Sequence, residues 1–406
     1  MKKIIKLYAD TSLILRIVIG LIIGALLGIF MPGAATVGML GDIFVGALKA
    51  IAPVLVFFLV CSSLAGASEG IGERFKTVIL LYLLGTFLSA VVAVLASFLF
   101  PITVELTVGA SESTPPGGIA EVLLNLISSM VMNPVTALEE ANYIGILFWA
   151  VLGGMALRLM KADSTAKVIS DLADMVSAVV RWIIQMAPFG VLGLVFKAVS
   201  GSGLGIFTTY GKLLLLLVGS MAVVTLIVYP AITALFLKMN PYPLVFKCLR
   251  ESGITAFFTR SSAANIPVNM ALCERLGLDK DFYSVSIPLG ATINMGGAAV
   301  TITIMTMTCA HTLGMSVDIP TAVVLSALAA LGACGASGVA GGSLLLIPMA
   351  CSLFGISNDI AMQMVAVGFI IGVVQDSVET MINSSSDALF TAVAEFHDWR
   401  IRGREV

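Results

Sequence analysis

The amino-acid sequence predicts an all-α protein embedded in a lipid bilayer, with eight membrane-spanning helices and two re-entrant helical hairpins. Hydrophobic residues make up 59% of the 406 residues and charged residues only 11%, whereas soluble domains carry about a quarter charged residues. Apolar runs long enough to cross a bilayer, roughly 20 residues, recur along the chain. Two later apolar segments are interrupted at their centres by polar or glycine-rich sequence, which is typical of re-entrant hairpins.

The N-terminal part of the chain, about residues 12–240, contains six apolar runs. They lie near residues 12–31, 43–66, 75–101, 143–160, 174–196 and 211–237. Because five others follow the first run, we expect it to be a spanning helix and not a cleaved signal peptide. The segment 102–142 holds prolines, serines and glycines and predicts a loop before a partly apolar stretch. We expect the whole chain to form a single transmembrane unit.

The distribution of lysine and arginine predicts the orientation. Positive residues lie before the first run, at 74–76, at 158–167 and in the C-terminal tail, whereas the segments 32–42 and 102–118 have none. Since positive residues in short loops stay cytoplasmic, we expect both termini on the cytoplasmic side of the cytoplasmic (inner) membrane. The exceptions to this alternation are Lys49, Lys197 and Lys212. We expect Lys49 to snorkel to the interface or to face a protein interior.

The composition disfavours nucleic-acid binding and enzymatic chemistry. A formal net charge of -2 and no basic run interleaved with aromatic residues leave no surface for nucleic acid. The six cysteines are scattered singly, which is typical of small core residues and not of disulfides or metal ligands. With only two histidines, a metal cluster or a serine–histidine pair is not expected, and we predict that the chain is not an enzyme.

Two interrupted segments in the C-terminal part, about residues 243–395, predict hairpins that enter the bilayer from opposite sides. Hairpin 1, about 243–272, has a polar stretch at residues 260–265 and basic residues on both flanks, so it should enter from the cytoplasm. Hairpin 2, about 320–355, has small residues at 335–342 and an uncharged loop before it, so it should enter from outside. Irregular backbone at membrane depth is tolerated only where it is buried or lines a cavity. Paired broken segments therefore predict an inverted-repeat transport site.

The two spanning segments beside the hairpins carry polar groups that lipid would reject. Segment 282–310 contains a glycine-rich stretch at 290–297, which would free carbonyl oxygens of the kind that hard cations bind. In segment 358–392 the polar residues share one helical face, which predicts a solute or ion path. These residues are Asp376, Glu379, Thr380, Asn383 and Asp387. The alternatives are an interfacial carboxylate cluster, serines that bond backbone carbonyls in a packed hairpin, and glycines that allow close helix packing.

These motifs, in this order, resemble those of the dicarboxylate/amino acid:cation symporters along essentially the whole chain. The motifs are Arg260-Ser261-Ser262, Asn294-Met295-Gly296-Gly297, Gly338-Val339-Ala340-Gly341-Gly342 and Asp376…Asn383…Asp387. The resemblance implies a homotrimer and sodium ions as the co-transported species. It also implies an elevator-type motion, in which a transport core of residues 243–395 with helices three and six slides against a scaffold made of the other N-terminal helices.

The resemblance also assigns roles to individual residues. The residues that would contact the substrate are Arg260, Ser261, Ser262, Val339, Asp376, Glu379, Thr380 and Asn383. Asp376 would accept from the substrate ammonium group, and Arg260 would pair with it when the site is empty. One sodium ion would bind the carbonyls of Gly290, Asn294 and Asn383 and the carboxylate of Asp387; a second would use Thr292 and the carbonyls near Ala333, Cys334 and Gly335.

Three positions depart from the pattern of carriers for acidic amino acids. Glu379 stands where those carriers have an arginine, Ala298 replaces a hydroxyl residue, and Gly296 replaces an aspartate that serves a further, deeper sodium site. A substrate carboxylate near Glu379 would meet a like charge. The expected substrates are therefore small neutral amino acids such as serine and threonine. We also expect fewer coupled sodium ions than in the carriers of acidic amino acids.

Other function classes find less support in the sequence. Within transporters, the alternative is a sodium- or proton-coupled symporter of dicarboxylates or acidic amino acids. A channel would need a continuous polar pore, whereas the polar groups here converge on one cluster. An intramembrane hydrolase would need a base near Ser261 or Ser262, and the neighbouring segments offer none.

Overall fold

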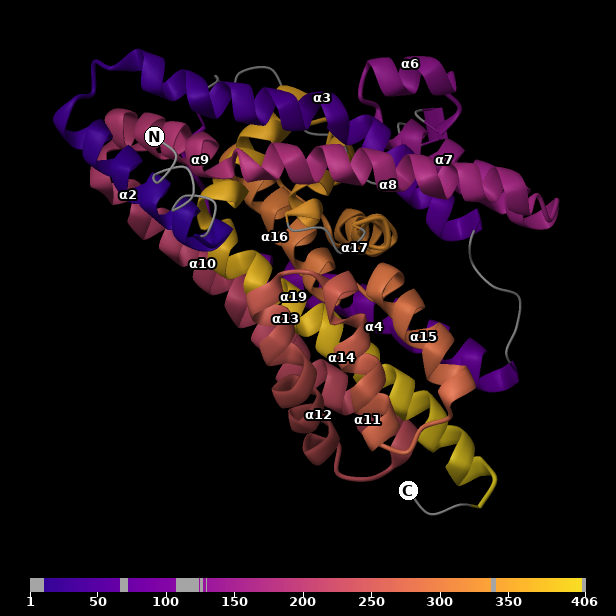
Figure 1. Cartoon of the computed structure of the whole chain (residues 1–406). Helices are drawn as coiled ribbons and strands as arrows, with labels where there is room; N and C mark the ends of the chain where they lie inside the picture. Colours follow the sequence, from indigo (N-terminus) through magenta and orange to yellow (C-terminus); the bar gives the residue numbers. More distant parts are fainter. Residues whose placement is uncertain are drawn as a thin grey trace.

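The regular structure of the described chain is entirely helical (Figure 1). The computed structural model describes residues 11–65, 72–106, 124, 127, 128, 130–336 and 341–403. Of the described helices, five are long and apolar enough to cross a membrane, and a bent pair supplies a sixth candidate span. Four shorter apolar helices accompany them. The chain is therefore a multi-pass membrane protein, and the count of eight crossings stays a prediction.

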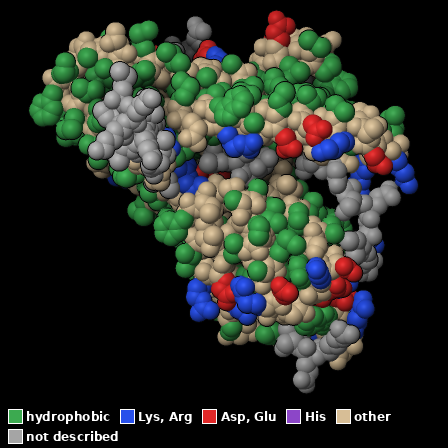
Figure 2. Space-filling model, in the orientation of Figure 1, with side chains coloured by type: hydrophobic (Ala, Val, Ile, Leu, Met, Phe, Trp, Pro, Cys, Tyr) green, Lys and Arg blue, Asp and Glu red, His purple; other side chains and the backbone are tan. Residues whose placement is uncertain are grey.

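One group of helices is formed by N-terminal segments that pack mainly on one another. It contains α2 (Leu13–Phe30), α3 (Ala35–Ala65), α7 (Tyr143–Leu159), α8 (Asp163–Gln185) and α9 (Ala187–Ser202), with the short α6 (Pro134–Glu139) against α7. Small residues allow the closest contacts in this group, since a Cβ added at Gly20 would lie 2.2 Å from the carbonyl oxygen of Pro188. In the space-filling view, hydrophobic side chains cover much of this group, and charged side chains follow α8 (Figure 2).

The predicted span 174–196 falls on two helices, because the chain bends at Met186. Helices α8 and α9 meet there at 55°. Pro188, the second residue of α9, has no N–H to bond the carbonyl of residue 184, so a continuous helix is disfavoured. Because the apolar run of the sequence continues across this bend, hydropathy does not predict the bend.

The second group surrounds the 44-residue helix α19 (Asn358–Ile401). It contains α4 (Gly72–Leu99), α10 (Ile206–Val223), the π-helical turn η2 (Val224–Val228), α11 (Tyr229–Leu237) and all later elements. The π-turn precedes Pro230, and the hydroxyl of Tyr242 donates to the carbonyl of Leu226 at 3.2 Å. A carbonyl that loses its helical partner to proline is thereby satisfied.

Both predicted hairpins are present as helix–turn–helix units. Hairpin 1 consists of α12 (Tyr242–Cys248), the π-turn η3 (Leu249–Gly253), α13 (Ile254–Thr259) and α14 (Ser262–Arg275). Hairpin 2 consists of α17 (Ile319–Ala333), the short 3-10 turn η4 (Gly342–Leu346) and α18 (Ile347–Ser352). At the tip of hairpin 1 Arg260 adopts a left-handed conformation, with φ 52°, and Ser261 accepts a hydrogen bond from the Ala264 N–H that caps α14. Residues 337–340, in the tip of hairpin 2, lie outside the described residues.

The two spanning segments beside the hairpins behave differently from each other. The predicted helix 282–310 is broken into α15 (Lys280–Ile293) and α16 (Gly296–Thr312), with Asn294 and Met295 between them, as the glycine-rich stretch indicated. The predicted helix 358–392 is the unbroken α19, which reaches nine residues further. Its last turns are tied to α11, because Arg400 donates to the carbonyl of Leu237 and a ring nitrogen of His397 lies 3.1 Å from the carbonyl of Phe236.

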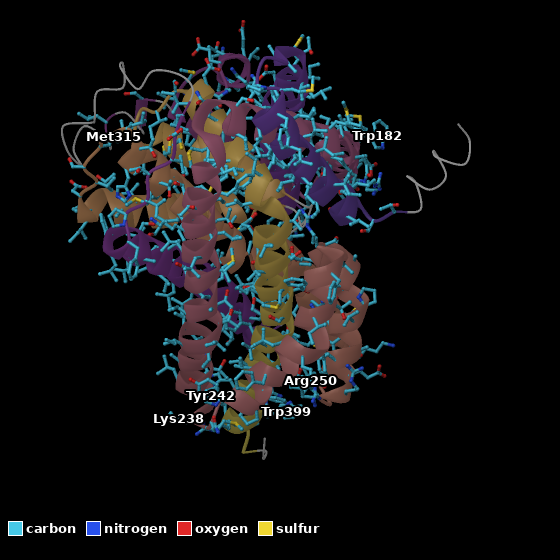
Figure 3. The ribbon with its side chains drawn as sticks, turned by 90° about the vertical axis from the view of Figure 1, so that its left-hand side faces the viewer. Trp182, Lys238, Tyr242, Arg250, Met315 and Trp399 are labelled. Atoms are coloured by element: carbon cyan, nitrogen blue, oxygen red, sulfur yellow. The ribbon has the colours of Figure 1, made fainter. Side chains whose placement is uncertain are left out.

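Aromatic and basic side chains collect at the end of the second group where the chain terminates. Figure 3 shows Lys238, Tyr242, Arg250 and Trp399 close together at this end, with Met315 near the opposite end. Such side chains are enriched at membrane interfaces, and basic ones on the cytoplasmic side. The orientation of the chain across the membrane stays a prediction.

Candidate functional site

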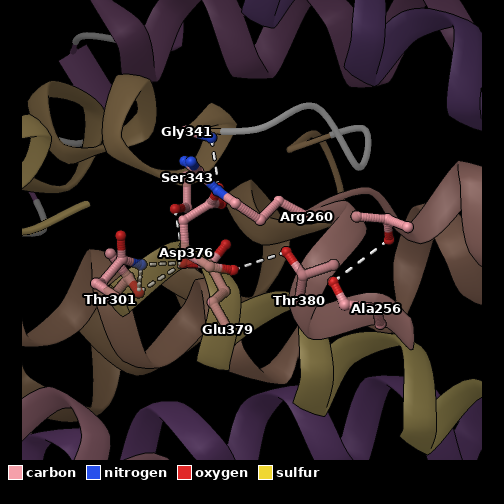
Figure 4. Close-up of polar contacts among 10 residues, drawn as sticks. Ala256, Arg260, Thr301, Gly341, Ser343, Asp376, Glu379 and Thr380 are labelled. Atoms are coloured by element: carbon pink, nitrogen blue, oxygen red, sulfur yellow. Dashed lines mark hydrogen bonds and ion pairs between the residues drawn. The ribbon is translucent and has the colours of Figure 1, made fainter. Parts of the chain in front are cut away.

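The tips of both hairpins meet α19 at a buried ion pair. Arg260 Nε donates to Asp376 Oδ2 at 2.5 Å, and the Gly341 N–H donates to Asp376 Oδ1 at 3.2 Å (Figure 4). The side chains of Arg260 and Asp376 are only 11% and 4% exposed. The left-handed turn at Arg260 directs its side chain to α19, and Gly341 holds a φ of 72° that favours glycine. The pairing that the sequence predicted for the empty site is present.

The carboxylate of Glu379 is held by three donors from three elements. Its Oε2 accepts from Thr301 of α16 at 2.7 Å, from Ser343 of η4 at 2.8 Å and from the Gln375 amide of α19 at 2.5 Å (Figure 4). Within the described part of the chain, its Oε1 accepts no hydrogen bond. Glu379 therefore connects hairpin 2 to α16 and α19.

The residues on either side of Glu379 in the polar stripe face neighbouring backbone. Asn383 Oδ1 accepts from the Gly297 N–H at 2.7 Å, which fixes the orientation of its amide. A Cβ at Gly297 would lie 2.7 Å from the carbonyl oxygen of Glu379, so only glycine allows this approach of α16 to α19. The Thr380 hydroxyl donates to the Asp376 carbonyl of its own helix at 2.8 Å. Asn383 is thus placed to offer its Nδ2 group to a ligand, whereas the proton of the Thr380 hydroxyl is already bonded within its own helix.

Deeper along α19, the break between α15 and α16 meets Asp387. Asn294 Nδ2 donates to Asp387 Oδ1 at 2.9 Å and to the Ser386 hydroxyl at 2.7 Å. Asn294 Oδ1 and Asp387 Oδ2 are buried and have no hydrogen-bond partner in the described chain. Buried acceptors are normally satisfied, and a carboxylate and an amide oxygen without donors suit a hard cation. These residues therefore fit a sodium ion.

A glycine and a tyrosine shape the surroundings of Asp387. A Cβ at Gly290 would lie 2.9 Å from Asp387 Oδ1 and 2.8 Å from the Tyr82 hydroxyl, so α15 can approach only without a side chain there. The Tyr82 hydroxyl lies 2.9 Å from that of Thr391 and donates to the Ser286 carbonyl at 3.1 Å. Gly290 thus lies beside Asp387, where the sequence placed it.

The residues assigned to the second sodium ion come together at the ends of α15 and α17. The thiol of Cys334 donates to the carbonyl of Ile293 at 3.4 Å, which brings the start of the hairpin 2 turn beside Thr292. The Thr292 hydroxyl donates to the Leu289 carbonyl, and the Ala333 carbonyl accepts from the Ala336 N–H. Among the described residues of this second site, no buried side-chain oxygen lacks a partner, in contrast to Asp387.

Two further predicted substrate contacts, Ser261 and Ser262, lie at the start of α14. Ser261 caps α14 with its hydroxyl, while the neighbouring Ser262 is buried at the first turn of that helix. Val339 lies outside the described residues. The sequence interpretation missed Gln375, Thr301 and Ser343, of which Gln375 carried a signal because it lies four residues before Glu379 on the same helical face.

The structure has no room for a side chain at Gly296. A Cβ there would lie 2.1 Å from the hydroxyl oxygen of Tyr229 and 2.7 Å from that of Ser89. Tyr229 therefore fills the space in which the acidic-amino-acid carriers are expected to have an aspartate. That this chain couples fewer sodium ions than the carriers of acidic amino acids stays a prediction.

The site is closed in this conformation. The cavity beside Arg260 and Asp376 measures about 10 Å³, and Leu344 and Phe369 are among the residues that line it. A cavity of this size holds about one water molecule, so an amino acid does not fit there. Binding at this place therefore requires the residues around the ion pair to move apart.

Helical hairpins that close on carboxylates of a membrane helix define an ion-coupled membrane transporter. Here the carboxylates are those of Asp376, Glu379 and Asp387, and their partners come from the broken segments. The chain belongs to the sodium:dicarboxylate symporter family, whose model matches residues 13–396.

Several relatives match the chain over nearly its full length. A protein of Bifidobacterium adolescentis named serine/threonine transporter SstT is 58% identical over 400 residues, covering 98% of this chain and 93% of the relative. Proteins with the same name from Streptococcus thermophilus and Streptococcus agalactiae are 55% identical over 401 residues and 57% identical over 396 residues. These alignments cover 98% and 97% of this chain, and 100% and 98% of the relatives.

The replacement Asp387→Asn tests the proposed sodium ligands. It removes the negative charge next to the Asn294 oxygen that has no hydrogen-bond partner. Because an uncompensated cation in a buried site costs several kcal/mol, sodium affinity should fall by roughly 100-fold. Sodium-dependent thermal stabilisation of the purified protein measures this. Asp398→Asn, near the end of the same helix, is the matched control. Unchanged sodium stabilisation in Asp387→Asn would show that Asp387 is not a ligand.

Proposed function

We propose that this chain is a sodium-coupled symporter that imports serine and threonine across the cytoplasmic membrane of a bacterium. Its family and the names of its relatives support transport of this kind. The observation that carries the choice of a neutral substrate is Glu379, a buried carboxylate on the same face of α19 as Asp376, whose Oε2 is fixed by three donors. A buried carboxylate accepts a hydroxyl proton and repels a second carboxylate.

The proposed binding mode replaces contacts that the protein makes with itself. The substrate ammonium group takes the place of Arg260 on Asp376, which exchanges one charge-assisted contact for another. The freed guanidinium, the Asn383 amide and the N–H groups at the start of α14 then face the substrate carboxylate. Sodium at Asp387 lies one helical turn from Asn383, so the two ligands share one face of α19.

The proposed assembly is a homotrimer in which a transport core moves against a scaffold. The two helix groups support this proposal, because α2, α3, α7, α8 and α9 pack mainly with each other, and α4 and α10–α19 pack mainly with one another. Helices α4 and α10–α11 correspond to the third and sixth predicted helices. Both termini are proposed to lie in the cytoplasm, which agrees with the basic residues near the end of α19.

Uptake into proteoliposomes tests this function. Radiolabelled serine should accumulate under an inward sodium gradient and should not accumulate under a proton gradient alone. Threonine should compete with labelled serine, while aspartate and succinate should not. Uptake of succinate or aspartate with no uptake of serine would replace this proposal with a dicarboxylate or acidic amino acid symporter.

Replacement of Glu379 tests the basis of selectivity. In Glu379→Ala the difference between serine and alanine should shrink, because a site without a buried acceptor no longer penalises the analogue that lacks the hydroxyl. Glu379→Arg combined with Ala298→Thr should shift preference toward aspartate, by about tenfold or more, since a charged hydrogen bond contributes roughly 1.5–3 kcal/mol. Competition of labelled serine uptake gives the ranking.

The control for this series is Glu274→Ala, which removes an exposed carboxylate of α14. It should leave the ranking of amino acids as in the unmodified protein. If the Glu379 variants also keep the original ranking while they still transport, Glu379 does not contact the substrate side chain.

A further inference from the structure

A second cavity of about 420 Å³ lies between the two helix groups, away from the closed site. It is bounded by α3, α9, α10 and the first turns of α19, together with the segment that follows α4. Five charged residues line it: Asp42, Lys49, Glu105, Lys197 and Asp359. We call this space the outer vestibule. Its volume exceeds that of several water molecules, so a small solute fits with part of its hydration.

The charged side chains of the outer vestibule form two opposed ion pairs. Lys197 Nζ lies 2.5 Å from Asp42 Oδ1 within the first helix group, and Lys49 pairs with Asp359 across the two groups. The side chains are 43% and 60% exposed in the first pair and 42% and 75% exposed in the second. Pairs this exposed contribute at most about 1 kcal/mol, so a solute with the same charges can exchange into them at little cost.

The position of these lysines is unusual for a membrane protein. Lys49 and Lys197 are two of the three residues that break the alternation of positive charge along the sequence. The vestibule is lined by the first half of α3, the end of α9 and the start of α19, which is the end of α19 opposite to the C-terminus. Lysine is depleted on the external side, so two of them around one cavity indicate a ligand or a counter-ion.

The same two helices line the outer vestibule and the closed site. On α19, Ile370 faces the vestibule and the adjacent Phe369 faces the cavity at Asp376. On α9, Leu194 lines the vestibule and Val191, one turn earlier, lines the inner cavity. Phe369 packs edge-on against Phe44 with ring centroids 5.0 Å apart. The vestibule and the inner cavity are therefore neighbours along α9 and α19.

We propose that the outer vestibule is a weak binding site for zwitterionic amino acids, which occupy it before they reach the closed site. The amino acid carboxylate binds Lys49 or Lys197, and its ammonium group binds Asp42 or Asp359. Each charge of the amino acid is then bound by a side chain that, without the amino acid, pairs with a residue of opposite charge. Because the contacts are to the groups common to all amino acids, this site does not discriminate between side chains. The inference rests on the proposed function in that the solute is an amino acid.

Ligand-observed NMR on the full-length protein in detergent tests this site separately from the central one. The background is Arg260→Ala with Asp376→Ala, which removes both members of the central ion pair and leaves no unpaired charge there. Saturation transfer to serine should persist in this background, with a dissociation constant on the order of 1 mM. Glycine and alanine should compete with serine equally well, whereas acetate or methylammonium alone should not.

Neutralising the vestibule gives the decisive comparison. Adding Lys49→Gln with Lys197→Gln should weaken serine binding by about fivefold for each lost ion contact. The matched control is Lys167→Gln with Asp171→Asn, an exposed pair on α8, which should change nothing. The proposal would be overturned if the background protein gave no serine signal, or if neutralisation left the serine signal unchanged. Competition with serine by acetate or methylammonium alone would also overturn it.

Serine uptake by the unmodified protein separates this inference from the proposed function. If uptake is present and the second site is absent, only the outer vestibule assignment fails. If the unmodified protein neither binds nor transports serine, the proposed function fails, and the vestibule is then judged by glycine binding in the same background.

Discussion

The structure depends on how three carboxylates are compensated inside a membrane protein. Asp376, Glu379 and Asp387 are all buried on one helix, where an uncompensated charge costs several kcal/mol. Each has different partners. Asp376 accepts from an arginine and a backbone N–H, and Glu379 accepts from three neutral donors. Asp387 accepts from an asparagine amide, and its other carboxylate oxygen has no donor in the described chain. Every such partner that is not on α19 itself comes from a hairpin, from the break between α15 and α16, or from α16, which follows that break. The irregular backbone is therefore located where the charges require it.

This arrangement also explains how binding and movement can be linked. Arg260 and Ser343 of the hairpins hold α19 through contacts to Asp376 and Glu379, and in the proposed binding mode a solute with an ammonium group and a hydroxyl replaces these contacts. Asp387, one turn beyond Asn383, offers the place where a cation completes the charge balance. Solute and sodium then act on the same helical face, and each changes the contacts that hold the broken segments closed.

The sequence predicted the elements whose signal is local. Both hairpins, the break at Asn294 and the polar face of α19 were found because polar or glycine residues interrupt apolar runs. The bend at Met186 was missed because apolar residues continue across it. Hydropathy also gave no reason to pair Lys49 with Asp359, which lie 310 positions apart. The partners of Glu379 were missed for a related reason: Thr301 and Ser343 are single hydroxyl residues in apolar surroundings, and only packing brings them to one carboxylate. The substrate and sodium roles of the site residues stay predictions.

In the proposed mechanism, sodium at Asp387 and an amino acid at Asp376 bind to one coupled site. Serine binding to the purified protein, titrated at a series of sodium concentrations, measures this coupling. We expect the serine dissociation constant to fall as sodium rises, and serine to tighten sodium binding by the same factor, as thermodynamic linkage requires. A serine affinity that is independent of sodium would show that the two ligands bind without coupling.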